Sequence, residues 1–420
     1  MDNIQRGYKQ LLISSVYGKG GRVLKEINKV CVSESRLVRE FTELTALDSP
    51  SFGERKVADF LTAKLKALGF SVEEDRAWEK ALSKENGIPE EENKKGKVDR
   101  AGNLYGFLKG SIPGDPVLFS AHMDTVEPSR GKKAILESDG TIHSDGTTVL
   151  GADDAAGLVE ILEGIRAVLE SGYPHRDIEV LFPIAEELYT VGTSSMTEEE
   201  FGKIKAKEAY VPDMSGTPGT AANRAPSLIS FRATVTGRAS HAGFEPEKGI
   251  HAIQAAAEAV SKIKMGHIDK ETTCNIGMIR GGSGTNIVPE TCTAEGEIRS
   301  YVHEKALACM DRVTEIFRQT AESCGASADV RYTIHLHAYE TELESVPVRR
   351  FRRVCQSLGL AGDIISTFGG SDNNTFAEHG IKGLVLSCGM YQAHSVKEYT
   401  RTADLAAGAK LIAGLILDAE

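Results

Sequence analysis

Several features that mark other classes of protein are scarce or missing in this sequence. No apolar run approaches the roughly 18 residues that a membrane-spanning helix needs. The seven cysteines are an odd number, and none of them belongs to a Cys-x-x-Cys pair. We therefore expect free or buried thiols in a reducing compartment rather than a disulfide framework. Basic residues are also fewer than acidic ones, 49 against 60. The resulting net charge of −11 disfavours a nucleic-acid partner.

The amino-terminal segment lacks the pattern of a secretory signal. Arg6 and Lys9 are followed by a short apolar stretch, residues 11–16, which Gly18 and Lys19 then interrupt. A signal peptide needs an apolar region of about 7–15 residues that is not broken in this way. Together with the cysteine usage, this pattern predicts a cytoplasmic protein.

The rest of the composition is that of a folded protein with more than one domain. The chain has 420 residues, of which 41% are hydrophobic and 26% are charged. This is enough apolar material for a sizeable core, so a disordered or fibrous chain is excluded. At about 150 residues per domain, the length predicts two or three domains.

Apolar periodicity predicts an α/β layer in the first half of the chain. Apolar residues recur at helical spacing over residues 34–69, with a break at 48–51. Residues 73–100, of which 16 of 28 are charged, are expected to form a solvated hairpin or loop insertion. Strands and one helix then alternate at 117–121, 158–169 (the helix), 178–184 and 209–211. Alternation of this kind predicts a mainly parallel sheet.

The pattern changes near residue 225 and returns near residue 335. In between, the order is strand, helix, strand, strand, helix, strand, over residues 228–236, 249–264, 273–280, 291–301, 304–324 and 328–334. This order is the split βαβ arrangement of ferredoxin-like domains. The α/β pattern then resumes with elements at 348–358, 383–387 and 405–417. We expect a catalytic α/β domain of residues 1–224 and 335–420, interrupted by a smaller α+β domain of residues 225–334.

Acidic and histidine residues follow several of the predicted strands. His122 and Asp124 come directly after the strand at 117–121. Residues i and i+2 of an extended chain share a face, so Asp124 can orient the ring of a metal-binding His122. Asp153 and Asp154 stand together where a helix begins. One aspartate is explained as a helix cap, and a carboxylate that bridges two metal ions would explain the other.

Three further segments complete the pattern. Glu186 and Glu187 follow the strand at 178–184, Asp213 follows the strand at 209–211, and His394 comes after the strand at 383–387. Each segment alone has an ordinary explanation: a solvated glutamate pair, a turn-forming aspartate and a surface histidine. However, the ends of buried strands are where open α/β sheets bind ligands.

Together these segments supply two imidazoles and three carboxylates but no thiolate. Such donors suit two zinc ions, with cobalt or manganese as alternatives. Two metals about 3.5–4 Å apart can share a bridging water and lower its pKa. Glu186 is then left to act as general base, taking the proton from that water and passing it to the leaving amine. The predicted metal ligands are His122, Asp153, Glu187, Asp213 and His394.

The order of these motifs resembles that of the co-catalytic zinc exopeptidase family: His-x-Asp, Gly-Ala-Asp-Asp, Glu-Glu, Asp and a late His. The family includes peptidase T, glutamate carboxypeptidase, aminoacylase and succinyl-diaminopimelate desuccinylase. The resemblance extends over residues 34–418. It implies that His122 and Glu187 bind one ion, that His394 completes the second and that Asp153 bridges them. Asp213 would bind the second ion or be shared, depending on the branch of the family. It also implies that the interrupting domain is a lid through which the chain forms a homodimer. Many relatives carry a lysine after the aspartate pair, where this chain has Ala155.

The resemblance also implies a set of substrate-binding residues. His241 resembles a lid histidine that stabilises the oxyanion. Asn286 and Arg299 resemble residues that grip the carboxylate of the substrate, for which an arginine fork is suited. Gly370 belongs to a glycine-rich loop, residues 369–372, that lines the site in the family. Without the resemblance, these residues would be interpreted as a loop histidine and surface polar groups.

These features predict a metal-dependent peptidase that hydrolyses small peptides at a free terminus, most similar to tripeptide aminopeptidases of the peptidase T type. An amidohydrolase (deacylase) or carboxypeptidase that acts on N-acyl amino acids or dipeptides is the alternative within the same fold. A non-catalytic protein that binds metal or peptide is disfavoured, because Glu186 and all the predicted ligands are present.

Overall fold

The computed structural model describes residues 27–81 and 100–418, so most of the charged segment 73–100 lies outside the described residues. No helix in these ranges is long and apolar enough to cross a membrane. The chain divides into two compact units. The first comprises Met1–Asn223, Thr341–Ile365 and Ser371–Glu420, and the second comprises Arg224–Glu340 and Ser366–Gly370.

The first unit is built on a large mixed sheet. In spatial order its strands are β1 (Ser71–Glu74), β2 (Leu104–Leu108), β6 (Ile178–Phe182), β3 (Val117–Ser120), β7 (Glu208–Met214), β18 (Lys382–Ser387) and β8 (Thr220–Ala225), and β16 (Tyr339–Glu340) and β17 (Asp363–Ser366) pair with β8. The four central strands β6, β3, β7 and β18 are parallel. Antiparallel pairs involving β1, β2 and β8 extend the sheet on both sides. The predicted α/β class is confirmed, with a sheet that is parallel only in its centre.

The sheet of the first unit is covered on both faces. Successive residues of β3 alternate between two apolar clusters, since Val117 and Phe119 belong to one and Leu118 to the other. The larger cluster includes residues of α2 (Glu34–Thr45), α3 (Arg55–Ala67), α6 (Ala152–Ser171), α11 (Val346–Leu358) and α13 (Thr402–Leu417). The smaller one includes Phe201 of α8 (Glu198–Phe201) and Phe376 of α12 (Asp372–Glu378). This explains why the central strands are continuous apolar runs.

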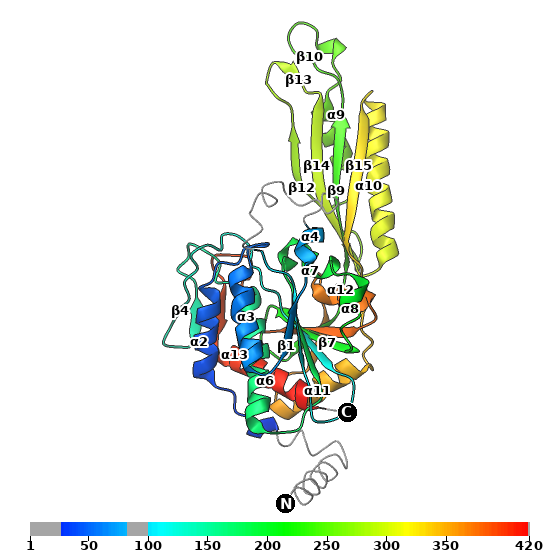
Figure 1. The fold of residues 1–420 in the computed structure, drawn as a ribbon. Coiled ribbons are helices and arrows are strands. Elements are labelled where there is room, and N and C mark those ends of the chain that lie inside the picture. The colour runs from blue at the N-terminus through cyan, green and yellow to red at the C-terminus, as the bar shows by residue number, and fades with distance from the viewer. Residues whose placement is uncertain (1–26, 82–99, 419–420) are drawn as a thin grey trace, which may run out of the picture. The chain divides into compact units, whose positions relative to one another are not determined.

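Helix α6 lies in the interior of the larger cluster (Figure 1). It is buried along most of its length and contacts both α2 and α13. A helix that is apolar on nearly all sides is expected at such a position. The break predicted at residues 48–51 separates α2 from α3, as expected.

The remaining elements of the first unit are short. They are η1 (Ile27–Lys29), α4 (Ala77–Ala81), η4 (Glu186–Leu188), α7 (Val191–Ser194) and the strands β4 (Ile135–Leu136), β5 (Thr141–His143) and β19 (Tyr399–Arg401), which form a sheet in the order β19-β5-β4.

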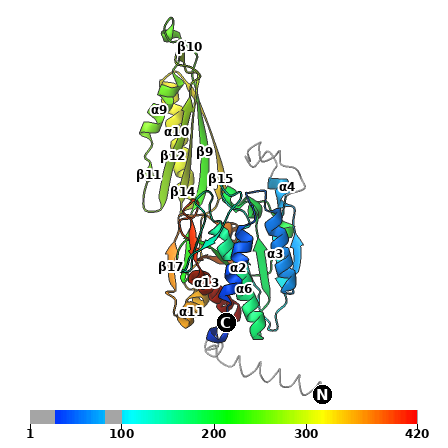
Figure 2. The ribbon, with the colours of Figure 1, turned by 90° about the vertical axis from the view of Figure 1, so that its left-hand side faces the viewer.

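The second unit has the ferredoxin-like arrangement that the segment order predicts (Figure 2). Its antiparallel sheet has the order β11 (Gly266–His267), β12 (Thr272–Gly281), β14 (Thr291–Ser300), β9 (Ser227–Thr236) and β15 (Ser327–Leu336). Alternate residues of β9, among them Phe231 and Val235, join a cluster with α9 (Ala252–Lys262) and α10 (His303–Ser323). A short pair, β10 (Ser240–His241) with β13 (Ile287–Val288), and η5 (Pro246–Lys248) complete the unit.

Candidate metal centre

The predicted metal ligands meet at the carboxyl edge of the parallel strands. His122 follows β3, the glutamate pair lies in η4 after β6, and Asp213 is near the end of β7. Asp153 is in the first turn of α6, and His394 lies in the segment after β18. Carboxyl ends of parallel strands share one edge of a sheet, so residues distant in the sequence converge there. All of them belong to the first unit.

The carboxylate of Asp153 lies between the two imidazoles. Its Oδ1 is 3.0 Å from Nε2 of His122, and its Oδ2 is 3.2 Å from Nε2 of His394. Nε2 of His122 also lies 3.8 Å from Oδ1 of Asp213, and Nε2 of His394 lies 3.0 Å from Oε2 of Glu187. Each imidazole therefore has one carboxylate of its own and shares a second.

This donor set fits metal ions. Ligand atoms of His122, Glu186 and Asp213 lie within 4.8 Å of one another, and so do those of His122, Asp153 and Glu187. Oε1 of Glu187 is buried and has no hydrogen-bond partner among the described residues. Imidazoles and carboxylates at this spacing are typical of zinc and of related divalent ions.

The electrostatics of the site reflect its crowded charges. Burial lowers the pKa of His122, but hydrogen bonds to Asp124 and Asp153 outweigh burial and raise that pKa well above the usual histidine value. Contacts with Asp153 and Glu187 raise the pKa of His394 to about 10. Burial raises the pKa of Glu186 well above the ordinary glutamate value, against the opposing charge of His122. Groups with such shifted pKa values in one place are typical of functional sites.

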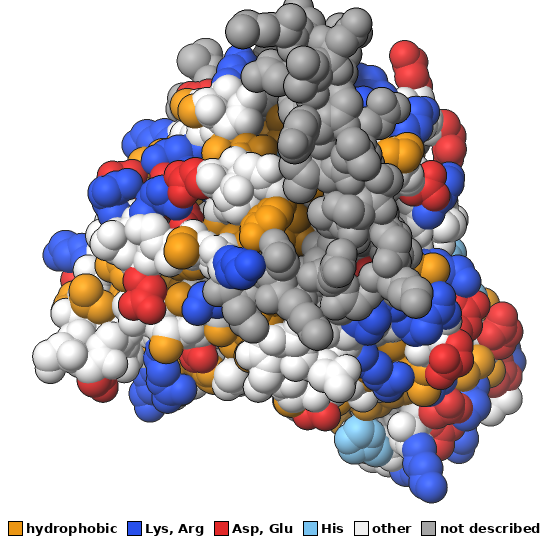
Figure 3. Space-filling view, turned by 90° about the horizontal axis from the view of Figure 1, so that it is seen from below, with side chains coloured by type: hydrophobic (Ala, Val, Ile, Leu, Met, Phe, Trp, Pro, Cys, Tyr) orange, Lys and Arg blue, Asp and Glu red, His pale blue; other side chains and the backbone are white. Residues whose placement is uncertain are grey.

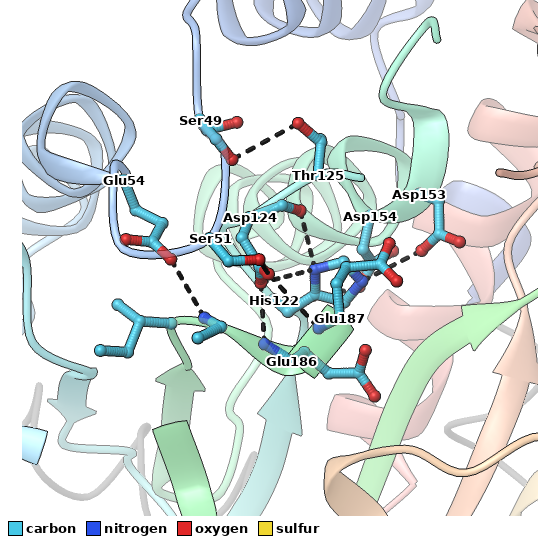
Figure 4. A network of polar contacts seen from close by, with 12 residues as sticks. Ser49, Ser51, Glu54, His122, Asp124, Thr125, Asp153, Asp154, Glu186 and Glu187 are labelled. Carbon is cyan, nitrogen blue, oxygen red and sulfur yellow. Dashed lines mark hydrogen bonds and ion pairs between the residues drawn. The ribbon is translucent and has the colours of Figure 1, made fainter. Parts of the chain in front are cut away.

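Asp124 connects the histidine to the glutamate pair (Figure 4). Nδ1 of His122 lies 2.9 Å from the backbone carbonyl of Asp124 and 3.3 Å from its carboxylate. The same carboxylate accepts the N–H groups of Glu186 and Glu187, at 2.9 and 3.3 Å, and the hydroxyl of Ser51 at 2.7 Å. It therefore fixes the ring of His122 and the backbone that carries both glutamates.

The two adjacent aspartates have different tasks. Asp154 accepts the N–H of Gly157 at 3.1 Å and the N–H of His122 at 3.3 Å, so it is the helix cap. Asp153 has φ −84° and ψ 98°, which is outside the helical region, and its carboxylate contacts the imidazoles instead. The peptide bond between the two residues is cis.

The backbone is left-handed at several residues of the loops that carry these side chains. Ala185, Tyr189 and Thr190 have φ values of 49°, 66° and 55°, and Gln392 and His394 have 52° and 61°. Residues with a Cβ seldom adopt positive φ, and such strained backbone tends to occur at functional sites.

Two buried glutamates support the centre and were not assigned from the sequence. Glu398 accepts the N–H groups of Gly151 and Asp153, at 2.7 and 2.9 Å. Glu54 accepts the N–H of Ala185 at 3.1 Å. Glu398 stands four residues after His394, but no sequence pattern shows that it reaches a segment 245 residues earlier.

The four residues predicted to bind substrate, His241, Asn286, Arg299 and Gly370, all belong to the second unit. His241 is exposed on β10, and its Nδ1 accepts the N–H groups of residues 243 and 244. Arg299 donates to the carboxylate of Glu297, at 2.9 and 3.2 Å, and to the carbonyl of Phe368 at 2.8 Å.

Comparisons with known proteins agree with this geometry. Residues 103–227 match the model of peptidase family M28, and residues 224–323 match the peptidase dimerisation domain. The uncharacterized protein YqjE of Bacillus subtilis is 34% identical over 92% of this chain and 99% of its own length. A solved tripeptidase from Staphylococcus aureus is 31% identical, with a TM-score of 0.84, and covers 93% of this chain and 100% of its own. The solved aminopeptidase PepT from Bacillus cereus is 36% identical, with a TM-score of 0.81, over 92% and 99% of the two chains.

This chain belongs to the PepT-like family of metallopeptidases. The prediction of a metal-dependent peptidase is therefore confirmed at the level of enzyme class. The metallopeptidase has its cluster of imidazoles and carboxylates in the first unit, and the dimerisation-domain match falls in the second unit.

Proposed function

We propose that this metallopeptidase is an aminopeptidase that removes the amino-terminal residue from short peptides, tripeptides foremost, with two zinc ions. The observation that carries the proposal is the carboxylate of Asp153, which contacts an imidazole with each of its oxygens. A carboxylate in that position is suited to bridge two ions. The similarity to a tripeptidase and to an aminopeptidase supports the choice of substrate.

We assign His122 and Asp213 to one ion, Glu187 and His394 to the other, and Asp153 to both. The distances of 3.8 Å from His122 to Asp213 and 3.0 Å from His394 to Glu187 support this division. It differs from the division that the family resemblance implied, in which His122 and Glu187 shared an ion. Donors of this kind favour zinc, with cobalt or manganese as substitutes.

Glu186 is the proposed general base. A pair of divalent ions bound by these residues would lower the pKa of a water molecule and polarise the carbonyl of the scissile bond. Glu186 takes the proton of the attacking water as the new C–O bond forms at the carbonyl carbon. It then gives that proton to the nitrogen of the leaving amine, and the peptide C–N bond breaks. A pKa raised by burial suits a group that first accepts and then donates a proton. Asp124 keeps the backbone of Glu186 in place.

The second unit supplies the remaining parts of the proposal. We assign His241 to the oxyanion, Asn286 and Arg299 to the carboxylate of the peptide, and Gly370 to the wall of the substrate site. The dimerisation-domain match over residues 224–323 supports a homodimer. Seven cysteines without a disulfide support a reducing, cytoplasmic location.

The substitution Glu186→Gln tests the chemistry. It keeps the size of the side chain but removes the basic oxygen, so we expect kcat to fall by about 10² or more while metal content and KM stay close to wild type. Glu199→Gln, an exposed glutamate on α8, is the control and should be neutral. A Glu186→Gln enzyme with bound metal that retains more than about a tenth of the wild-type kcat would remove Glu186 from this role.

A substrate panel tests the specificity. We expect cleavage of free tripeptides, with the amino-terminal residue released, and no cleavage of the same tripeptides after acetylation of the amino group. Preferred cleavage of peptides at a carboxyl-terminal glutamate would favour a carboxypeptidase instead. Preferred hydrolysis of N-acyl amino acids would favour a deacylase.

A further inference from the structure

A cavity of about 490 Å³ lies in the first unit at the opposite edge of the sheet from the metal centre. Its walls include Glu208 at the start of β7, Lys382 at the start of β18 and the first turn of α11. Strand β7 runs from Glu208 at the cavity to Asp213 at the metal centre. At about 3.3 Å per residue, those five steps separate the two sites by about 16 Å. The cavity is therefore distinct from the peptidase site.

Basic residues predominate among the charged residues of this cavity. Five line it, Arg176, Lys207, Arg349, Arg350 and Lys382, against the three acidic residues Asp115, Glu208 and Glu344. This local excess of positive charge contrasts with the net charge of −11 for the whole chain. Figure 3 shows one face of the molecule, seen from below, on which blue and red side chains both occur.

The inner part of the cavity holds two guanidinium groups in fixed positions. Arg176 and Arg350 are only 5% and 3% exposed, and both donate to the carboxylate of Glu208. Arg176 also donates to the carbonyl of Leu415 at 3.0 Å, and its Nε has no hydrogen-bond partner among the described residues. Buried arginines held in this way cost little further entropy when they meet a ligand.

The outer part of the cavity has cations without an acidic partner. Lys207 and Arg349 are exposed, and neither forms an ion pair with any residue in the described part of the chain. The amino terminus of α11, which has 13 residues, adds further positive potential. Its N-cap, Ser345, makes no capping bond, and the buried hydroxyl of Ser345 has no partner among the described residues.

We propose that this cavity binds a small doubly charged oxyanion of the phosphate class, either free phosphate or a phosphate monoester. Arginine forks, lysines and a helix amino terminus are the groups that proteins use for phosphate. The volume lies in the range of ordinary small-molecule sites. The binding does not depend on the peptidase reaction, because the two sites share no residue.

Titration calorimetry on the metal-loaded full-length enzyme tests the proposal, with inorganic phosphate and glycerol phosphate as ligands. The test variant is Lys207→Gln with Arg349→Gln, two exposed residues whose replacement leaves the buried arginines in place. The control is Lys56→Gln with Lys66→Gln, which removes the same charge from two exposed lysines of α3. Phosphate that binds at the metal centre is retained in both variants, so it does not confuse the comparison.

We expect the test variant to bind phosphate at least about tenfold more weakly than the wild type and the control variant to bind it like the wild type. Tighter binding of glycerol phosphate than of phosphate would identify a phosphorylated metabolite as the ligand, and equal binding would identify the phosphate group alone. Equal phosphate affinity in the two variants, or no binding by the wild type at millimolar phosphate, would overturn the proposal. Succinate that binds as tightly as phosphate would overturn the phosphate assignment.

Discussion

At the scale of single residues, the candidate metal centre depends on side chains that are not themselves proposed metal ligands but hold those ligands in position. Asp124 fixes the ring of His122, and Asp154 caps α6, which leaves Asp153 free to meet both imidazoles. Glu398 holds the backbone of Asp153 from the segment that carries His394. One short segment therefore supplies a proposed ligand of one ion and positions the carboxylate that we propose both ions share.

The substitution Glu398→Gln should weaken metal binding. The carboxylate of Glu398 accepts two N–H groups, from Gly151 and Asp153, at 2.7 and 2.9 Å. An amide offers one acceptor oxygen, so one of these N–H groups loses its partner and the loop of Asp153 shifts. We expect metal affinity, measured by titration with cobalt, to fall by about 10–100-fold.

Glu179→Gln is the matched control for this measurement. Glu179 is also buried and accepts the backbone N–H groups of Lys205 and Ala206, but it lies on β6 away from the ligands. Its substitution should lower stability without changing metal affinity. An equal loss of metal affinity in both variants would show that Glu398 acts only through general stability.

Residue spacing indicated which imidazoles and carboxylates meet at the candidate centre but not which residues support them. His122 and Glu187 each follow a buried apolar strand and Asp213 lies near the end of another, and such strands are visible in a single sequence. The contact of Glu398 with Asp153 spans 245 residues and needs the folded chain. The basic lining of the cavity beside Glu208 could not be predicted from the sequence for the same reason, because Arg176, Lys207 and Lys382 come from separate segments.

At the scale of elements, the packing of α6 against α13 contains a carboxyl group without a partner. Glu160 of α6 is 1% exposed, and its Oε1 has no hydrogen-bond partner among the described residues. A Cβ added at Gly408 of α13 would lie 2.0 Å from this carboxyl group, so the two helices approach closely there. Burial raises the pKa of Glu160 well above the ordinary value, and the charges of Asp154 and Asp404 raise it further.

Glu160→Gln should therefore stabilise the protein at neutral and higher pH. With a pKa raised on folding, the native state binds more protons than the unfolded chain, so stability falls as pH rises above the ordinary glutamate pKa. The amide carries no charge and avoids this loss. We expect a gain of about 1–3 kcal/mol in the free energy of unfolding at pH 8, which shrinks towards pH 4. Denaturant unfolding at both pH values measures it.

Glu163 offers a contrast on the same helix. Glu163 is buried, as Glu160 is one turn earlier, but Glu163 forms ion pairs with Arg36 at 2.6 Å and with Arg166 at 2.9 Å. Removal of its charge leaves two cations without that partner, so Glu163→Gln should destabilise the protein. If Glu160→Gln and Glu163→Gln change the free energy of unfolding in the same direction at pH 8, the presence or absence of an ion pair does not explain the effect of either substitution.

Element boundaries were predictable where the apolar pattern was long. The helix at 304–324 and the strand at 228–236 lie close to α10 and β9. The strands β2 and β8 were not predicted, and they give the sheet its antiparallel parts. Residues 220–225 contain no apolar residue larger than alanine, so they do not stand out as a strand. Residues 104–108 form a short apolar run, which periodicity alone does not distinguish from a buried helical segment.

At the scale of the whole molecule, we expect metal binding and folding to be coupled in one unit only. All the proposed ligands lie in the first unit, and the second has an apolar cluster of its own between its sheet and the helices α9 and α10. Ions that bind only the native state stabilise it, by about 4 kcal/mol when free metal is at 1,000 times its Kd. Removal of metal should therefore loosen the first unit and leave the second unit folded.

Hydrogen exchange measured by mass spectrometry, with and without a chelator, tests this coupling. After chelation we expect faster exchange in residues 151–157, 185–190 and 392–398, which carry the ligands and their supports and lie in the first unit. Exchange in β9, β12 and β14 should stay unchanged, since their hydrogen bonds lie within the sheet of the second unit. Readdition of zinc should restore protection. Equal loss of protection in both units would mean that they unfold together, and unchanged exchange around residue 153 would mean that no ion is bound there.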